Sequence, residues 1–393
     1  MGRNLVVDAD GHCYEPDTGL VAWLPEEYKH LAPNRVTDTS GYSHLMIEGR
    51  LAARRRWGGG ADRGAVFADH IERSRPGMTD ATQRLPDMDE EGIDIAVIFG
   101  TSIALMVNGM ANKPLAAAIC HAVNRWLVEE YLVPDPKRLK GVGLIPLQDP
   151  AAAVKELEFL AQHSGIASAM LPTNVYGINL GDRQFDPVYA AAQEMGIPLS
   201  VHPQTEHDGQ LGVWGVMGAG SERMEKYSYV HMTAFPFELM IALMHMIGEG
   251  VFDRYPTLRV GFMEGACGWL PFWAERMDEH FEKLRPQWPL LKRKPSEIMR
   301  SPQVCFTCEP EETILPYVLD TMGITQVMYA SDYRHWDSEF PNSVQNLEAI
   351  PGLSDEQQRA VLGENALRWF GLEPRELPVP RDVATGSDMT PNP

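Results

Sequence analysis

Residues 6–12 read VVDADGH, a short apolar run that leads into two carboxylates and an imidazole at alternate positions. Successive side chains alternate across an extended backbone, so Asp10 and His12 would face the same side. A carboxylate and a neutral imidazole on one side are suitable ligands for a divalent first-row metal. The stretch therefore predicts a buried strand with a metal site at its carboxyl end. The alternative is a strand that runs into a polar turn at Asp10-Gly11.

The 393 residues are 44% hydrophobic and 22% charged, which is typical of a soluble globular protein. The net charge of -20 argues against a nucleic-acid partner, because phosphate binding needs a basic surface. We find no apolar run of membrane-spanning length and no signal peptide, so we expect a cytoplasmic protein. The cysteines form no paired framework and are predicted to be reduced, although two have C-x-x-C spacing: Cys13, Cys120, Cys267, Cys305 and Cys308.

Eight apolar runs alternate with helical patterns along the chain. The predicted strands cover about 5–7, 94–100, 139–147, 166–171, 197–202, 258–264, 303–308 and 327–332. The predicted helices cover about 80–91, 114–132, 149–163, 186–196, 235–250, 269–284, 311–322, 344–350 and 355–370. This alternation predicts a parallel sheet, and eight units in a chain of this length favour a closed (β/α)8 barrel of the TIM type.

We expect one domain over residues 1–375, followed by a flexible tail at 376–393 that is rich in Pro, Asp and Ser. Two insertions, at about 36–77 and 204–229, interrupt the alternation. The first contains Arg54-Arg55-Arg56, and we interpret it as a solvated insertion. The alternative is a basic segment that folds over an anionic substrate.

In such barrels the active site lies at the carboxyl ends of the strands. His202, Glu264 and Asp332 end the predicted strands five, six and eight. Each alone could simply cap a turn. Of these residues, His202 and Asp332 form with Asp10 and His12 a set rich in carboxylates and imidazoles. This set indicates a site for zinc, manganese or iron, with an open position for water or substrate.

The ordered set of motifs is similar to that of a known family. The motifs in this chain are 8–12 (DADGH), 201–203 (VHP), 250–260 (GVFDRYPTLRV), 331–335 (SDYRH) and 363–370 (GENALRWF). The chain resembles the amidohydrolase superfamily, in particular the amidohydrolase-related branch that includes aminocarboxymuconate semialdehyde decarboxylase. The resemblance extends over nearly the whole chain, except for the two insertions and the tail.

This resemblance implies one divalent metal ion in the mouth of the barrel. Carried over by position, its ligands are Asp10, His12, His202 and Asp332. We expect zinc, with manganese or iron as alternatives. The resemblance also implies a homodimer or a higher homo-oligomer.

One position departs from the family pattern. The family usually has an acid–base histidine at the end of strand six, where this chain has Glu264. A buried carboxyl with a raised pKa can transfer protons, but Glu264 could instead bind metal or pair with a cation. His231 could supply the imidazole, or be a helix-start residue in a polar pocket. Arg334 and His335, just past strand eight, are candidates for substrate binding.

The leading hypothesis for function is metal-dependent, non-oxidative decarboxylation of a small aromatic or unsaturated carboxylic acid, with Glu264 or His231 as the proton donor. The alternative is hydrolysis of an amide, ester, lactone or C–C bond by metal-bound water, with Asp332 as general base. A third hypothesis is a catalytically inactive binding barrel, which would hold no stoichiometric metal.

Overall fold

The fold was analysed in a computed structural model of the chain. It describes residues 4–16, 19–37, 39, 43–48, 50–51, 75–204, 218–220, 224, 226–335 and 337–372. The arginines at 54–56 and the predicted tail at 376–393 lie outside the described residues, as does most of the second insertion.

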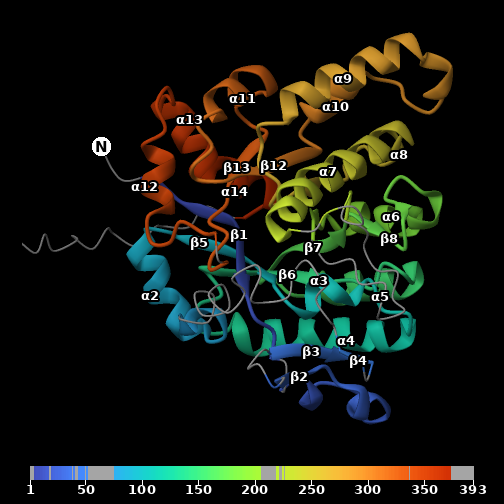
Figure 1. Ribbon diagram of the computed structural model, residues 1–393, viewed down its shortest axis with the longest axis vertical. Helices are drawn as coiled ribbons and strands as arrows, with labels where there is room; N and C mark the ends of the chain where they lie inside the picture. The colour runs from blue at the N-terminus through green and yellow to red at the C-terminus, as the bar shows by residue number, and fades with distance from the viewer. Residues whose placement is uncertain are drawn as a thin grey trace, which may run out of the picture.

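The described chain folds around a sheet of eight parallel strands that neighbour one another in chain order (Figure 1). The predicted (β/α)8 barrel is confirmed, and each of the eight predicted strands is present. Their residues are buried almost throughout, as expected for strands covered on both faces. The strands are β1 (Val7–Cys13), β5 (Ile95–Gly100), β6 (Leu139–Leu144), β7 (Ile166–Pro172), β10 (Leu199–His202), β11 (Val260–Phe262), β12 (Val304–Cys308) and β13 (Val327–Tyr329).

The first strand lies further along the chain than predicted. The sequence placed it at residues 5–7, whereas β1 runs from Val7 to Cys13 and contains the polar residues. Asp8, Asp10 and His12 are 0%, 1% and 0% exposed. The strand extends through them because its pairing with β5 continues, with a shift in register between Asp8 and Gly11.

The ring closes where the segment after β13 returns to β1. The Asp332 N–H donates to the Asp10 carbonyl at 3.0 Å, and the His12 N–H donates to the Tyr333 carbonyl at 2.5 Å. These bonds join the first and last parts of the barrel at the carboxyl ends of its strands. They therefore bring the predicted site residues on both segments together.

Helices surround the sheet (Figure 1). Side-chain caps start several of them: Asp80, Asn112 and Asp149 accept bonds from backbone N–H groups in the first turns of α2, α4 and α5. The helices are α2 (Ala81–Glu91), α3 (Ile103–Val107), α4 (Lys113–Trp126), α5 (Pro150–Leu160), α6 (Asp186–Met195), α7 (Tyr227–Gly248), α8 (Val251–Arg254), α9 (Leu270–Lys283), α10 (Pro295–Met299), α11 (Leu315–Met322), α12 (Ser343–Glu348), α13 (Asp355–Arg359) and α14 (Asn365–Phe370).

Part of the first predicted insertion is regular structure. An antiparallel three-stranded sheet, β2 (Asn34–Thr37), β3 (Ser43–Ile47) and β4 (Arg50–Leu51), lies outside the barrel (Figure 1). Its strands are too short and too polar to give a clear alternating pattern. Near the carboxyl end of the chain, the predicted helix at 355–370 contains a π-helical segment at 360–364 between α13 and α14.

Helix α7 begins at Tyr227 rather than near residue 235, and it continues through Pro236. The predicted second insertion, 204–229, therefore overlaps its first turn. The expectation that no apolar run reaches membrane-spanning length is wrong for this helix. By length and composition alone Ser228–Gly248 could cross a membrane, but 56% of its apolar window is buried in the fold. Its apolarity thus reflects packing against the barrel.

The core is continuous across the barrel and its inner helix faces. Phe262 of β11 and Phe306 of β12 stack with ring centroids 5.7 Å apart, and each is 1% exposed. Trp269 meets the Phe306 ring edge-on at 5.7 Å. These rings pack β11 against β12 just below Glu264, which follows β11 at the mouth of the barrel.

Replacing Phe306 with alanine should lower the free energy of unfolding by about 3–5 kcal/mol, because it leaves a cavity in a fully packed region. Chemical denaturation of the purified proteins measures this. Val133→Ala is the control, since Val133 is 58% exposed and its truncation should cost no more than about 0.5 kcal/mol. Equal effects of the two substitutions would contradict the packing assigned to Phe306.

Candidate metal centre

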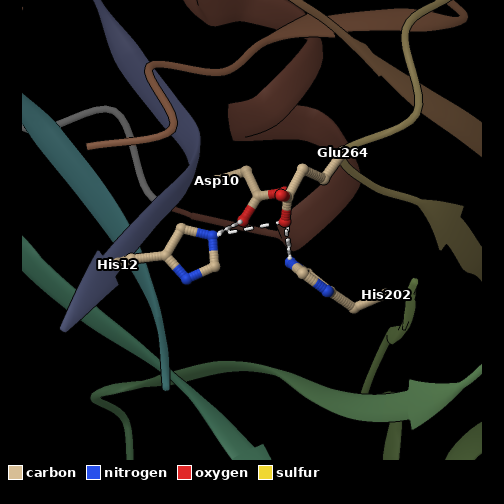
Figure 2. A group of neighbouring side chains, drawn as sticks. All are labelled: Asp10, His12, His202 and Glu264. Atoms are coloured by element: carbon tan, nitrogen blue, oxygen red, sulfur yellow. Dashed lines mark ion pairs between the residues drawn. The ribbon is translucent and has the colours of Figure 1, made fainter. Parts of the chain in front are cut away.

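Four side chains from or just after three strands of the barrel converge on one point (Figure 2). Asp10 and His12 come from β1, His202 ends β10, and Glu264 follows β11. Each offers one ligand atom, and these atoms lie within 4.8 Å of one another. The side chains are between 0% and 10% exposed. The group therefore lies in the mouth of the barrel, shielded from bulk water.

Glu264 lies between the two imidazoles. Its Oε2 atom is 2.6 Å from His202 Nε2 and 3.6 Å from His12 Nε2. Asp10 lies on the other side, with Oδ1 at 3.5 Å from His12 Nε2 and Oδ2 at 4.0 Å from His202 Nε2. Two nitrogens and two carboxylates thus surround a space of the size that a metal ion fills.

A second group shares two of these residues. His12 and Glu264 also lie with Asp332 and His335, again within 4.8 Å. Asp332 Oδ1 is 3.3 Å from His12 Nε2 and 2.6 Å from His335 Nδ1. The structure thus places three of the predicted ligands, Asp10, His12 and His202, in one group. The fourth, Asp332, lies in the adjoining group that shares His12 and Glu264 with the first.

The donor atoms fit a metal ion by a further observation. Buried polar atoms normally form hydrogen bonds, and those that do not need an explanation. Among the described residues, several buried atoms of this cluster have no hydrogen-bond partner outside it and face one another across it: both carboxylate oxygens of Asp10, Nε2 of His12, Nε2 of His202, Oε2 of Glu264 and Oδ1 of Asp332. A bound cation would satisfy all of them.

The electrostatics of the cluster are those of crowded, buried groups. Burial, reinforced by the charge of His335, lowers the pKa of His12 to about 3, so its imidazole is neutral and has a lone pair to donate. Burial would raise the pKa of Glu264, but His202 and hydrogen bonds from the neighbouring imidazoles hold it well below its usual range. Burial raises the pKa of Asp10 well above its usual range, and Glu264 adds to this shift.

Asp332 and His335 form a proton-sharing pair at the edge of the cluster. Burial raises the pKa of Asp332 well above its usual range, although His335 opposes the shift. Burial lowers the pKa of His335, but Asp332 and Glu264 outweigh it, so the net pKa lies well above the ordinary value. The imidazole is therefore suited to hold a proton beside the metal ligands.

The backbone is strained where these side chains leave their strands. Glu264 and Asp332 both have φ of 50°, in the left-handed region that residues other than glycine rarely adopt. Such conformations cost on the order of 1–3 kcal/mol each and persist when surrounding contacts fix them. Here the Glu264 N–H donates to Thr307 at 2.9 Å, and the Asp332 N–H donates to Asp10.

Thr101 joins two imidazoles and was not anticipated from the sequence. Its hydroxyl lies 3.2 Å from His12 Nδ1 and 3.4 Å from His335 Nε2. If His12 binds metal through Nε2, its Nδ1 carries the proton and donates to this hydroxyl. The only signal in the sequence is that Thr101 directly follows the strand at 95–100.

The remaining predicted residues lie outside the metal-sized groups. His231, on α7, is 3.7 Å from Asp337, and its ring lies on Phe235. The Arg334 side chain is half-buried, with its guanidinium 5.2 Å from the centre of the Phe340 ring. His231 thus reaches the cluster through Asp337, whose carboxylate is close enough to Glu264 and His335 to interact with their charges.

A buried carboxyl at the end of β7 was also missed. Glu238, on α7, is 5% exposed and accepts hydrogen bonds from Thr173 at 3.2 Å and Asn174 at 3.0 Å. Burial raises its pKa to about 7, although the hydrogen bonds from Thr173 and Asn174 oppose this shift. These hydrogen bonds fix α7 to the segment that follows β7.

Known proteins share this arrangement of the chain. The family model described as "Amidohydrolase" matches residues 7–372, from the first barrel strand to the last helix. The chain belongs to the amidohydrolase family. The family predicted from the motifs is thereby confirmed.

A curated relative of this amidohydrolase is the 2-amino-3-carboxymuconate-6-semialdehyde decarboxylase of Dictyostelium discoideum. It is 27% identical over 299 residues, which cover 76% of this chain and 78% of that protein. An amidohydrolase from Mycobacterium avium subsp. paratuberculosis superposes with a TM-score of 0.75 at 22% identity, covering 94% of this chain and 100% of the other. A dihydroxybenzoic acid decarboxylase from Polaromonas, solved with manganese and 2-nitroresorcinol, gives 0.66 at 19% identity, covering 95% and 99%.

We expect the purified amidohydrolase to bind a divalent ion. Asp10→Asn or His202→Ala should each weaken the affinity for this ion at least about 10-fold, because each substitution removes a donor atom from the cluster. Elemental analysis gives the stoichiometry, and competition with a chelator gives the dissociation constants. His163→Ala, in the turn between α5 and the start of β7, should leave the affinity unchanged because this turn lies away from the carboxyl ends of the strands. Affinities that do not differ between these variants would contradict the assigned cluster.

Glu238→Gln should change stability in a pH-dependent way. The pKa of Glu238 is about 7 in the folded protein and near 4.5 in the unfolded chain. The folded state is therefore not penalised by this group below pH 4.5, and stability is lost as the pH rises through about 7 and the buried carboxyl ionises. The free energy of unfolding of the variant minus that of wild type should therefore be about 2–3 kcal/mol larger at pH 9 than at pH 5. Denaturation at both values measures this. A pH-independent difference would show that Glu238 is ionised throughout.

Proposed function

We propose that this amidohydrolase is a metal-dependent, non-oxidative decarboxylase of a small aromatic or unsaturated carboxylic acid. The observation that carries the proposal is the buried cluster of unpartnered carboxylate and imidazole atoms at the strand ends. Two of the reported relatives, from Dictyostelium discoideum and Polaromonas, are decarboxylases of such acids, which supports the same reaction class.

Asp10, His12, His202 and Glu264 would hold the ion, with Asp332 as a further ligand on the side of His335. When bound, the cation supplies Lewis-acid stabilisation of negative charge that develops on substrate oxygens. Zinc was expected from the sequence. Three carboxylates beside two imidazoles, and the manganese in the Polaromonas structure, favour manganese for this donor set.

Decarboxylation requires a proton at the carbon that loses CO2. Glu264 is occupied between two imidazoles, so we assign this proton to His335, which Asp332 orients at 2.6 Å. His231, paired with Asp337, is the second candidate donor. The substrate would lie in the mouth of the barrel, over the metal ligands and beside His335, which packs directly on the His12 ring at 3.9 Å between centroids.

The proposed reaction is tested with 2,6-dihydroxybenzoate and 5-carboxyvanillate as probes, in deuterated water and in water labelled with heavy oxygen. We expect CO2 release, one deuterium at the carbon that carried the carboxylate, and no heavy oxygen in the product. Release of CO2 from neither acid, together with cleavage of an ester or lactone probe and heavy oxygen in its product, would instead support the hydrolase alternative, in which Asp332 activates water. Measurement by mass spectrometry separates the two.

The same assay assigns the proton donor. His335→Asn should lower kcat by about 100-fold or more, which is the usual contribution of a general acid, while metal binding is retained. His231→Asn is the matched variant on the other side of the mouth and should have a smaller effect. The reverse order of effects would transfer the role to His231.

We further propose a cytoplasmic homo-oligomer whose residues 1–375 form a single domain. Five free, buried cysteines are consistent with a reducing compartment. Three large apolar side chains on or next to α9 and α11, namely Phe272, Ile314 and Tyr317, are 60%, 45% and 58% exposed. Exposed apolar side chains on adjacent helices support a surface covered by a second copy of the chain.

A further inference from the structure

A buried ion pair lies directly behind the cluster. Asp8 of β1 and Arg84 of α2 are both 0% exposed, and Arg84 Nη2 lies 3.6 Å from Asp8 Oδ2. We propose that this pair is a positioning device. It fixes β1 against the segment after β13 and thereby holds the ligands on both segments at metal-binding separation. The inference rests on the metal centre of the proposed function.

The Asp8 carboxylate bonds to both segments at once. Its Oδ1 atom accepts from the Ser331 N–H at 2.9 Å and from the Asp10 N–H at 3.2 Å. Its Oδ2 atom accepts from the Ser331 hydroxyl at 2.6 Å. Both oxygens are therefore occupied, and Asp8 is not available as a ligand despite its alternate spacing with Asp10 and His12. Asp8 instead fixes the N–H of the ligand Asp10. It also fixes Ser331, the residue directly before the ligand Asp332.

Arg84 makes the same connection from the helix side. Its Nη1 atom donates to the His12 carbonyl at 3.2 Å, and its guanidinium lies 3.4 Å from the centre of the Tyr333 ring. Tyr333 directly follows Asp332 in the chain. A buried guanidinium requires a carboxylate partner, and its planar shape suits an aromatic face. Arg84 and Asp8 thus form one unit beneath the two ligand segments.

The backbone around the pair is shaped to admit it. A Cβ atom at Gly11 would lie 2.5 Å from Asp8 Oδ2 and 2.6 Å from Arg84 Nη2. Gly11 separates the ligands Asp10 and His12, and the β1 register shifts over this stretch. The ion pair therefore occupies the space that a side chain between the two ligands would fill.

The test separates positioning from stability. Asp8→Leu and Arg84→Met each leave a buried unpaired charge, so each should destabilise the metal-free protein. The double variant removes both charges and should recover much of that stability. We expect its affinity for Mn²⁺ or Zn²⁺, whichever wild type binds more tightly, to stay about 10–100-fold weaker than wild type. Chelator competition and denaturation of the metal-free protein measure the two quantities.

Two further variants keep the test decisive if the charge variants do not fold. Ser331→Ala removes only the hydroxyl bond to Asp8 and should weaken metal binding at least about 3-fold without unfolding the protein. Asp94→Asn is the control at the opposite end of the barrel, where Asp94 accepts from the Val6 N–H at 2.9 Å. It should lose stability while its metal affinity stays that of wild type.

The outcomes distinguish this inference from the proposed function. Wild type that binds no stoichiometric ion would overturn both. Wild type that binds an ion, with Ser331→Ala and the double variant equal to it in affinity, would overturn the positioning role alone. The same conclusion follows if affinity and stability recover together in the double variant.

Discussion

The hydrogen bond from the Asp332 N–H to the Asp10 carbonyl joins the two ends of the barrel at the point where the chemistry lies. It connects residues more than three hundred positions apart in the chain, and each carries a carboxylate of the cluster. Because ligand atoms must lie within a few ångströms of one ion, small movements at this junction would separate them. The closing bonds, the strained residues Glu264 and Asp332, and the buried Asp8–Arg84 pair all act on this geometry.

The charges of the cluster favour a bound cation. Asp10, Glu264 and Asp332 are buried close together, and burying several carboxylates without a positive partner is costly. The protein responds by raising the pKa of Asp10 and Asp332, whereas contacts with His202 keep Glu264 ionised. A divalent ion would offset this repulsion, so metal binding and the stability of the mouth are thermodynamically linked.

The sequence predicted the barrel and the strand-end positions of the site because both follow from periodicity. Buried strands appear as apolar runs, and polar residues directly after them must lie at the mouth. Features that depend on contacts across the fold were beyond this reasoning. Nothing in the sequence separates Asp8 from Asp10, since both occupy alternate positions of one strand. Only the structure shows that Ser331 and Arg84 occupy the first carboxylate.

Other differences have similar causes. The sequence placed the start of α7 too late for two reasons. The first turns of this helix carry polar and aromatic residues that resemble a loop, and Pro236 suggests a helix start rather than an interior position. Asp337 and Thr101 join the site from loops, where no period marks them. The family assignment succeeded despite these differences because its motifs lie on the strands and not on the loops.

Glu264 gives the site its own chemical character. A histidine at the end of strand six would be neutral or positive, whereas Glu264 adds a negative charge between His12 and His202. A carboxylate in that place is a stronger ligand for a hard cation and a weaker proton donor at neutral pH. Proton transfer must then come from a group that the cluster keeps protonated. In the proposed reaction His335 would meet this requirement, because its Nδ1 lies 2.6 Å from Asp332 Oδ1 and 3.7 Å from Glu264 Oε1. The substitution at strand six and the histidine after strand eight are therefore two parts of one arrangement.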